Sequence, residues 1–206
     1  MKHLIETTDS SSLATVRYDR IVLDSSTNDV IVRGGGYEYV DLGLSVKWAK
    51  CNVGAEKETD AGLYFAWGET TGYTASQVGT DKHFSLSDYK YGNSYKNLTK
   101  YNQSDGKTVL ESTDDAATQI MGSDWRMPTE TEFQELIDNT NKKWTQVNGV
   151  NGYKFTSNKE GYQNNSIFIP NSGYRSYETF SDQGKYGYLW CTRLNEEFIH
   201  AGQIYY

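Results

Sequence analysis

The chain has 206 residues and a net charge of −7, and its 14% aromatic content includes 17 Tyr and 5 Trp. This length fits one domain, or one domain with a small appendage. Leu, Ile, Val and Phe make up just under a fifth of the chain. This low aliphatic content alone does not indicate disorder, because disordered chains also contain few aromatic residues. Each aromatic ring can bury about 150–250 Å² of surface in a core. We therefore expect a folded domain with a core built on rings.

The charge balance, 27 Asp and Glu against 20 Lys and Arg, argues against a nucleic-acid partner, because such a partner favours a basic stripe. No apolar run approaches the roughly 20 residues of a membrane-spanning helix, so membrane insertion is not expected. The first nine residues contain no apolar signal-peptide segment. We expect that the protein stays in the cytoplasm, leaves it by a route other than secretion, or has had a leader removed.

The two cysteines, Cys51 and Cys191, are far apart in the chain. They form neither a disulfide framework nor a zinc-site spacing. We expect two free, partly buried thiols, because lone cysteines tend to be buried. One long-range disulfide is the alternative.

A separate N-terminal unit is predicted before residue 37. Residues 15–23 and 30–33 are rich in strand formers and flank a polar turn at 24–29, which predicts a β-hairpin followed by a flexible joint at Gly34–Gly36. An isolated hairpin is only marginally stable in water. It must therefore dock on the main domain, pair with another chain or belong to something larger, and we favour attachment or oligomerisation. Residues 1–36 are assigned to this tail and hairpin, and residues 37–206 to one main domain.

The main domain begins with strand-like segments at 37–42 and 46–49, and a long irregular surface stretch covers 70–107. Residues 112–121 predict a helix with acidic residues in its first turn and Gly122 as its stop.

The clearest local pattern is a second helix at 128–137. Thr129 and Glu132 form a capping box, and Phe133, Leu136 and Ile137 form an apolar stripe. Short strands are expected after it. Since helices come first and an antiparallel sheet follows, the class is α+β. The predicted strands are 152–156, 166–170, 186–190 and 198–206.

Motifs of catalysis and metal binding are missing from the sequence. There is no HExxH, CxxC or GxSxG pattern, and no Gly-rich loop between a strand and a helix. Residues 102–106 partly resemble a calcium loop, but alignment on Gly106 puts Tyr101 at ligand position 1. We expect no catalytic residue, no metal site and no cofactor; an adventitious ion in the 70–107 loops is the alternative. The histidines are isolated from one another: His3, His83 and His200.

The last 35 residues are rich in rings interleaved with polar residues. Antibody paratopes have this mixture, and interface hot spots are enriched in Tyr, Trp and Arg. A recognition surface is one interpretation, and strands that complete an aromatic core are the other. Within residues 186–190 we expect Trp190 to be buried. The rings are Tyr174, Tyr177, Phe180, Tyr186, Tyr188, Trp190, Phe198, Tyr205 and Tyr206.

Four segments carry a further pattern: Tyr39–Ala55, Tyr64–Thr70, Asp124–Thr129 with Glu132, and Ser172–Arg175. Together they resemble a large group of C-type-lectin-fold domains abundant in gut Bacteroidetes and their phages, over residues 37–206. The group resembles the variable proteins of diversity-generating retroelements, such as phage tropism determinants, and also formylglycine-generating enzymes. In the variable proteins, this fold holds a C-terminal variable region whose side chains bind ligands such as host-surface receptors.

The resemblance implies a set of diversified ligand-binding positions around Trp190, which would be a fixed scaffold ring. Adenine-directed mutagenesis of Asn-type codons samples Tyr, Cys, Ser, Phe, His, Asp and Leu, and an exposed Cys or Phe is otherwise unusual on a fixed surface. The implied positions are Ser176, Tyr177, Glu178, Phe180, Asp182, Leu189, Cys191, Thr192, Glu196, Phe198, His200 and Ala201.

The chain departs from the resembled families at three places. Sugar-binding C-type lectins hold calcium with Glu-Pro-Asn or Gln-Pro-Asp and with Trp-Asn-Asp, whereas Ile169–Asn171 lacks the acid and Trp190–Thr192 lacks the Asn-Asp. Formylglycine-generating enzymes use a cysteine pair, which Cys191 alone does not supply, so no enzyme activity is expected. Many relatives continue past the last strand with another hairpin, so a closing strand is expected to be lost, replaced or removed here.

The expected architecture is an α+β, C-type-lectin-like domain with two helices and a small antiparallel sheet behind a short β-hairpin. The implied function is binding of a host cell-surface receptor, either protein or glycan, by a retroelement-diversified surface of a phage tail protein in the virion. Display as a homotrimer would raise avidity without new contacts. The alternative is a fixed adhesin or glycan-binding module on the surface of a gut bacterium.

Overall fold

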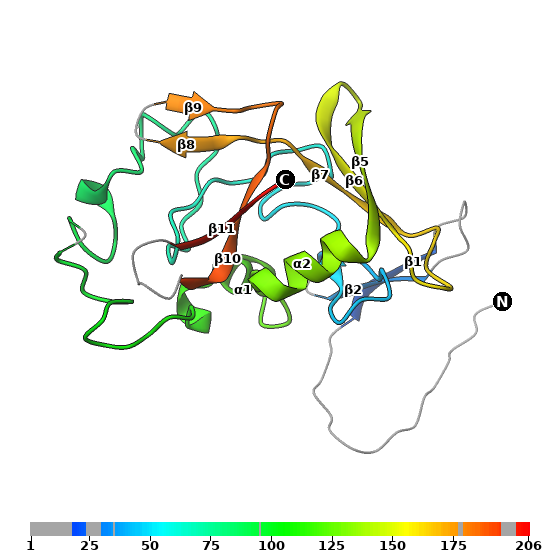
Figure 1. Ribbon diagram of the computed structural model, residues 1–206, viewed down its shortest axis with the longest axis horizontal. Helices are drawn as coiled ribbons and strands as arrows, with labels where there is room; N and C mark the ends of the chain where they lie inside the picture. The colour runs from blue at the N-terminus through cyan, green and yellow to red at the C-terminus, as the bar shows by residue number, and fades with distance from the viewer. Residues whose placement is uncertain (1–17, 24–29, 35, 95, 177–178, 195–200) are drawn as a thin grey trace, which may run out of the picture.

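A computed structural model describes residues 18–23, 30–34, 36–94, 96–176, 179–194 and 201–206. Within these ranges the chain combines two α-helices with small antiparallel sheets, a composition compatible with the α+β class (Figure 1). The helices are α1 (Ala116–Met121) and α2 (Glu130–Asp138), and the 3₁₀ segments are η1 (Leu86–Asp88) and η2 (Ser112–Asp114). The strands are β1 (Tyr18–Leu23), β2 (Val30–Gly34), β3 (Tyr39–Val40), β4 (Trp48–Ala49), β5 (Thr140–Val147), β6 (Val150–Ser157), β7 (Ser166–Pro170), β8 (Tyr174–Ser176), β9 (Thr179–Ser181), β10 (Tyr188–Leu194) and β11 (Ala201–Tyr205).

The N-terminal hairpin pairs β1 with β2 in antiparallel register, with Ile21 opposite Val32. This confirms the predicted strands at 18–23 and 30–33, whereas residues 15–17 of the first segment and the predicted turn at 24–29 lie outside the described residues. Strand β2 contacts β3, which pairs antiparallel with β4. The two strand-like segments expected at 37–42 and 46–49 are thus present but shorter.

The helix expected over residues 112–121 is interrupted at Asp115. Residues 112–114 form η2, and α1 begins only at Ala116 because Asp115 is extended, with φ −89° and ψ 112°. The Asp115 carboxylate caps α1 by accepting from the Thr118 amide at 3.0 Å, and it also accepts from the Met127 amide at 2.9 Å. The acidic side chain therefore caps the helix from outside its first turn, where it also holds the following loop.

The second predicted helix and its capping box are confirmed by α2. Thr129 Oγ1 accepts from the Glu132 amide, and Glu132 Oε2 accepts from the Thr129 amide at 2.9 Å. The buried face of α2 carries Phe133 and Leu136, and Ile137 packs partly against the same core. The apolar stripe therefore faces inward, as its spacing predicts.

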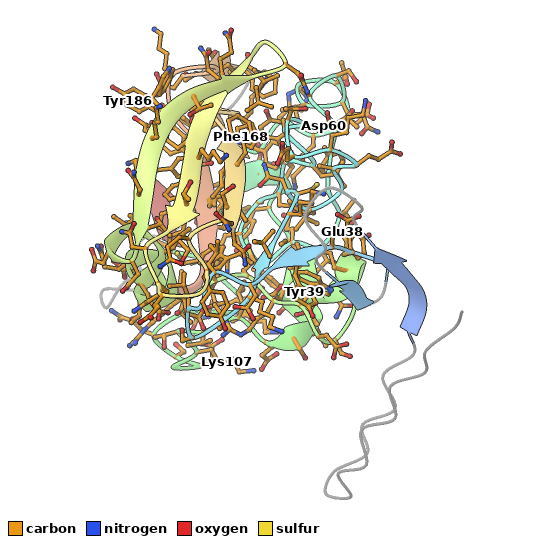
Figure 2. All side chains as sticks on the ribbon, turned by 90° about the vertical axis from the view of Figure 1, so that its right-hand side faces the viewer. Glu38, Tyr39, Asp60, Lys107, Phe168 and Tyr186 are labelled. Carbon is orange, nitrogen blue, oxygen red and sulfur yellow. The ribbon has the colours of Figure 1, made fainter. Side chains whose placement is uncertain are left out.

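Strands β5, β6 and β7 form an antiparallel sheet, and β5 contacts α2. Figure 2 looks onto this sheet, where Phe168 is labelled. Phe155 on β6 and Ile167 on β7 are paired across the sheet and pack against Phe133, and Tyr206 joins the same ring cluster. The predicted strands at 152–156 and 166–170 are confirmed, whereas β5 was not expected.

The irregular stretch expected at 70–107 contains η1 but no named strand among its described residues. Two of its rings, Tyr91 and Tyr101, form a second core cluster with Trp67 and with Leu194 of β10. Trp67 packs edge-to-face on Tyr101 with ring centroids 5.0 Å apart. This second core therefore anchors the long loops to β10.

A buried carboxylate holds the same loops to η2. Asp114 is 3% exposed and accepts hydrogen bonds from the hydroxyls of Tyr91 and Tyr101 and from the ammonium groups of Lys90 and Lys100. Burial by itself would raise the pKa of the Asp114 carboxyl, but these hydrogen bonds hold the pKa well below its ordinary value. The charge is thus fully partnered where it is desolvated.

Candidate functional site

Strands β8, β9 and β10 and the turn between β9 and β10 form the candidate site (Figure 1). Strand β8 pairs antiparallel with β9, so Arg175 lies opposite Phe180. Gly173, just before β8, forms a bridge with Gly187, just before β10, and its amide donates to the Tyr186 carbonyl at 2.9 Å. The β8–β9 hairpin and the start of β10 therefore form one continuous unit.

The implied positions differ in how much of them the structure describes. Side chains are described for Phe180, Asp182, Leu189, Cys191 and Thr192. Ser176 ends β8 and Ala201 begins β11, and only their place in these strands is described. The others lie outside the described residues: Tyr177, Glu178, Glu196, Phe198 and His200.

Phe180 stands in a cluster with Tyr64 and Arg175. Its ring packs edge-to-face on Tyr64, with centroids 5.2 Å apart, and the Arg175 guanidinium carbon lies 4.9 Å from its centroid. The Tyr64 hydroxyl donates to the Ser172 carbonyl at 3.1 Å, and burial raises the pKa of that phenol. A ring, a guanidinium and a phenol thus share one half-buried cluster, the combination that interface hot spots favour.

Asp182 stands in a second cluster, with Tyr174 and Tyr188. The Tyr188 hydroxyl donates to Asp182 Oδ2 at 3.0 Å, and the Tyr188 ring packs on Tyr174 with centroids 4.7 Å apart. Desolvation, assisted by the hydrogen bond to Asp182, raises the pKa of Tyr188 to about 12. At neutral pH Tyr188 is therefore a neutral phenol that donates to Asp182.

The turn between β9 and β10 is held by backbone and amide contacts. Asp182 has a left-handed φ of +58°, and its carbonyl accepts from the amides of Lys185 and Tyr186. The buried Asn171 side chain donates to the Lys185 carbonyl at 2.9 Å. Tyr186 at the end of this turn is 48% exposed, and Figure 2 labels it at the margin of the molecule. The turn is therefore a fixed support for an exposed ring.

Two implied positions do not belong to an exposed surface. Cys191 is 1% exposed and Thr192 is 6% exposed, so the expectation that these side chains lie at the surface is wrong. Trp67 Nε1 donates to the Cys191 carbonyl at 2.8 Å, and the backbone of Thr192 bonds to Leu110 and Pro128 on either side. These loops cover β10 at this point.

Both cysteines are free thiols, as predicted. Burial raises the pKa of Cys191 to about 12, so this thiol is neutral at physiological pH. Cys51 is half-buried, and burial raises its pKa as well.

Leu189 and Trp190 are both half-buried and pack against different cores. Leu189 packs against the cluster around Phe133, and Trp190 packs against the cluster around Trp67. The Trp190 indole donates to the Phe65 carbonyl at 2.9 Å. Trp190 is thus less buried than expected, although its contacts are those of a scaffold ring.

The sequence did not single out two contributors to the site. Tyr64 and Gly79 come from the long loops, far from β8 in the chain, and a side-chain carbon on Gly79 would clash with the Arg175 guanidinium. Two of the segments that carry the family resemblance contain Tyr64 and Arg175. That resemblance was the only feature of the sequence that pointed to these two residues.

A cavity of about 560 Å³ lies elsewhere, beside β3 and β4. Its wall includes the ion pair between Lys50 and Glu38, at 2.8 Å, and the Cys51 thiol. None of the implied positions with a described side chain lines this cavity, so it is separate from the candidate site.

Across the described ranges, His, Cys, Asp and Glu side chains form no group of three or more that could hold a metal ion. Among the helices described, none is long and apolar enough to cross a membrane. Comparison with protein-family models, curated proteins and solved structures returned no match to this chain.

Proposed function

We propose that the chain is a receptor-binding protein that presents the surface around β8, β9 and the 182–187 turn to a host cell-surface protein or glycan. The observation that carries this proposal is the pair of ring clusters at this surface. Phe180 is joined to Arg175 and Tyr64, and Tyr188 is joined to Asp182, in a unit whose backbone is hydrogen-bonded throughout the turn. Rings that are already held in place lose little entropy when a ligand binds.

The proposal includes a C-type-lectin-like scaffold, and two segments of the family resemblance have structural roles that support it. Trp67 holds the backbone of β10 through its bond to Cys191. Glu132 caps α2 and also accepts from Arg126 at 2.8 Å, which joins the α2 N-terminus to the preceding loop. These residues hold the scaffold beneath the proposed binding surface and are not part of it. Side chains on that surface can therefore be substituted without loss of these scaffold contacts.

We further propose that a retroelement diversifies the surface and that the protein is carried on a phage tail. The structure reduces the set of positions for this proposal. Cys191 and Thr192 are buried and are removed from it, and Leu189, which packs on the core, is expected to remain apolar. The positions retained are Ser176, Tyr177, Glu178, Phe180, Asp182, Glu196, Phe198, His200 and Ala201.

Deep sequencing of the locus in a population that carries it tests diversification. We expect substitutions to concentrate at the retained positions, including Phe180 and Asp182, while Trp67, Arg126 and Cys191 stay constant. Cys191 is an internal control, because it lies on β10 next to the surface but is buried. If Phe180 and Asp182 are as constant as Cys191, diversification is wrong and the fixed adhesin of a bacterial surface replaces it.

Light scattering of the full chain separates the two locations proposed for the protein. A homotrimer is expected for a tail protein that gains avidity by multivalent display. A monomer favours the fixed cell-surface module. Neither assignment includes a catalytic step or a cofactor.

A further inference from the structure

The β5–β6 hairpin is basic in a chain of net charge −7. Residues 139–159 contain four lysines and no Asp or Glu. Three of these lysines lie on the paired strands, and Lys142, Lys143 and Lys154 are all exposed and form no ion pair with any residue that the structure describes. The hairpin therefore offers a negatively charged ligand three uncompensated lysines.

One face of this hairpin combines a lysine with aromatic rings and amides. Trp144 lies opposite Tyr153, and their rings meet edge-to-face with centroids 5.3 Å apart and planes at 87°. Lys142 Nζ lies 4.4 Å from the Tyr153 centroid, so the ammonium is held over the ring that the indole also contacts. Because the planes are nearly perpendicular, neither ring lies flat on the other, and Trp144 is 45% exposed.

Two amides complete this face at the tip of the hairpin. Gln146 Nε2 donates to Asn151 Oδ1 at 3.1 Å, and Asn151 Nδ2 donates to the Gly184 carbonyl at 3.1 Å. Asn151 is thus engaged at both ends and orients Gln146, whose side-chain oxygen has no partner among the residues described. We call Lys142, Trp144, Gln146, Asn151 and Tyr153 the aromatic shelf.

Protection of a sheet edge explains only part of this arrangement. Lysines on an edge strand discourage pairing with another chain, and β5 is an edge strand, so Lys142 and Lys143 fit that role. Lys154 does not, because β6 is the central strand of its sheet. Edge protection also gives no reason for the exposed indole beside Lys142, since exposed Trp rings work against solubility.

We infer that the aromatic shelf is a binding site for an anionic sugar residue, either carboxylated or sulfated, in addition to the surface around β8 and β9, whose 182–187 turn the shelf meets where Asn151 bonds to Gly184. The Trp144 indole offers a flat apolar surface to the C–H face of a sugar ring. The Lys142 ammonium, on the same face and over the Tyr153 ring, is available to the carboxylate or sulfate, and the Gln146 oxygen is available to accept from a hydroxyl. This inference does not rest on the proposed function.

The composition of the shelf favours a sugar over single-stranded nucleic acid. Nucleic-acid grooves stack successive bases on several aromatic side chains along a basic track. Here one ring of the pair, Trp144, is well exposed, and one lysine lies over the other ring, Tyr153, in a chain that is acidic overall. That arrangement suits a single charged sugar unit.

The test is a titration of the full chain at low ionic strength with two probes, an oligogalacturonate, which is carboxylated, and a heparin oligosaccharide, which is sulfated. Tryptophan fluorescence is one readout, because Trp144 is the most exposed of the five tryptophans. Isothermal titration calorimetry is the second readout, because it can also be applied to variants that lack the Trp144 ring. We expect saturable binding of at least one probe, and which of the two binds identifies the source of the charge.

Two lysine variants form a matched pair. Lys142→Gln and Lys143→Gln remove the same charge from adjacent residues of β5 whose side chains point to opposite faces. We expect Lys142→Gln to weaken binding about fivefold and Lys143→Gln to change it by less than about twofold, since its charge acts only at a distance. Trp144→Ala should weaken binding about tenfold or more. Circular dichroism checks that Trp144→Ala is folded. If this variant is unfolded, the comparison of Lys142→Gln with Lys143→Gln still tests the inference.

Four outcomes would overturn the inference. These are no saturable binding of either probe, equal losses in Lys142→Gln and Lys143→Gln, equally tight binding of a neutral galacto-oligosaccharide, and tighter binding of an oligothymidylate than of both sugars. The last outcome would assign the shelf to nucleic acid instead.

Discussion

The hydroxyl of Tyr188 lies 3.0 Å from Asp182 Oδ2, and this bond joins the first residue of β10 to the turn that follows β9. Asp182 has a left-handed backbone, and its carbonyl closes the turn through Lys185 and Tyr186. The same residue therefore shapes the turn through its backbone and holds the neighbouring strand through its side chain. Rings at this surface are positioned before any ligand arrives.

Tyr188→Phe tests this bond while keeping the ring. Loss of the hydrogen bond is expected to lower the free energy of unfolding by about 1 kcal/mol, measured by urea denaturation. Because the pKa of Tyr188 is raised to about 12, its neutral form stabilises the fold below the unfolded phenol pKa of about 10, and this contribution is lost as the pH rises through 12. In a spectrophotometric titration the variant should therefore show one late phenol ionisation fewer than the unchanged chain, while other buried tyrosines such as Tyr101 still ionise late.

The matched control is Tyr186→Phe. Tyr186 is half-exposed, and no hydrogen bond of its hydroxyl is described, so its removal should leave stability unchanged within about 0.5 kcal/mol. Equal losses in the two variants would contradict the role given to the Tyr188–Asp182 bond.

Asp114 should make stability depend on pH in the acid range. Its folded pKa is depressed below the unfolded value of about 3.9, so its contribution is complete above about pH 5 and is lost as the pH falls through 3.9 towards the depressed pKa. Asp114→Ala should cost about 3 kcal/mol at pH 7, because Tyr91, Tyr101 and the two lysines lose a common acceptor. Denaturation of both proteins between pH 3 and 7 measures this.

The difference in stability between the chain and Asp114→Ala should shrink as the pH falls. Asp124→Ala removes a carboxylate at an exposed loop position and is the control, and its stability at pH 7 should stay within about 0.5 kcal/mol of that of the unchanged chain. A pH-independent difference for Asp114→Ala would mean that packing, rather than charge, accounts for its role.

The two thiols should differ in reactivity. Cys191 is buried and its pKa is raised to about 12, so it should not react with a thiol reagent in the folded protein. Cys51 is half-buried beside the cavity and should react slowly. Mass spectrometry after labelling, with and without denaturant, distinguishes them, and rapid native labelling of Cys191 would contradict its place in the core.

The capping box of α2 gives a prediction about stability. Thr129→Ala removes the acceptor for the Glu132 amide and should destabilise the fold by about 1 kcal/mol in a thermal or urea melt. Thr131→Ala changes the same residue type at an exposed position within α2, where alanine is the better helix former. It should be neutral or slightly stabilising, and a loss equal to that of Thr129→Ala would refute the capping role.

Local patterns in the sequence were sufficient for several elements. The strands of the N-terminal hairpin, the α2 capping box and strands β6 and β7 follow from alternation, capping residues and apolar spacing, which act over a few neighbouring residues. Strand β5 was missed because residues 140–147 are mostly polar and lack an apolar alternation. Its pairing with β6, rather than its own composition, makes it a strand.

At the candidate site, the chain itself specified the kinds of side chain but not their exposure. The ring-rich C-terminal region was visible in the sequence, and so were the free cysteines. That Cys191 lies inward while Asp182 holds Tyr188 at the surface depended on which loops cover β10, and Trp67, Leu110 and Pro128 come from distant parts of the chain. Exposure is a property of long-range packing, and neighbouring residues carry little information about it, so only the folded structure could separate a buried thiol from a surface position.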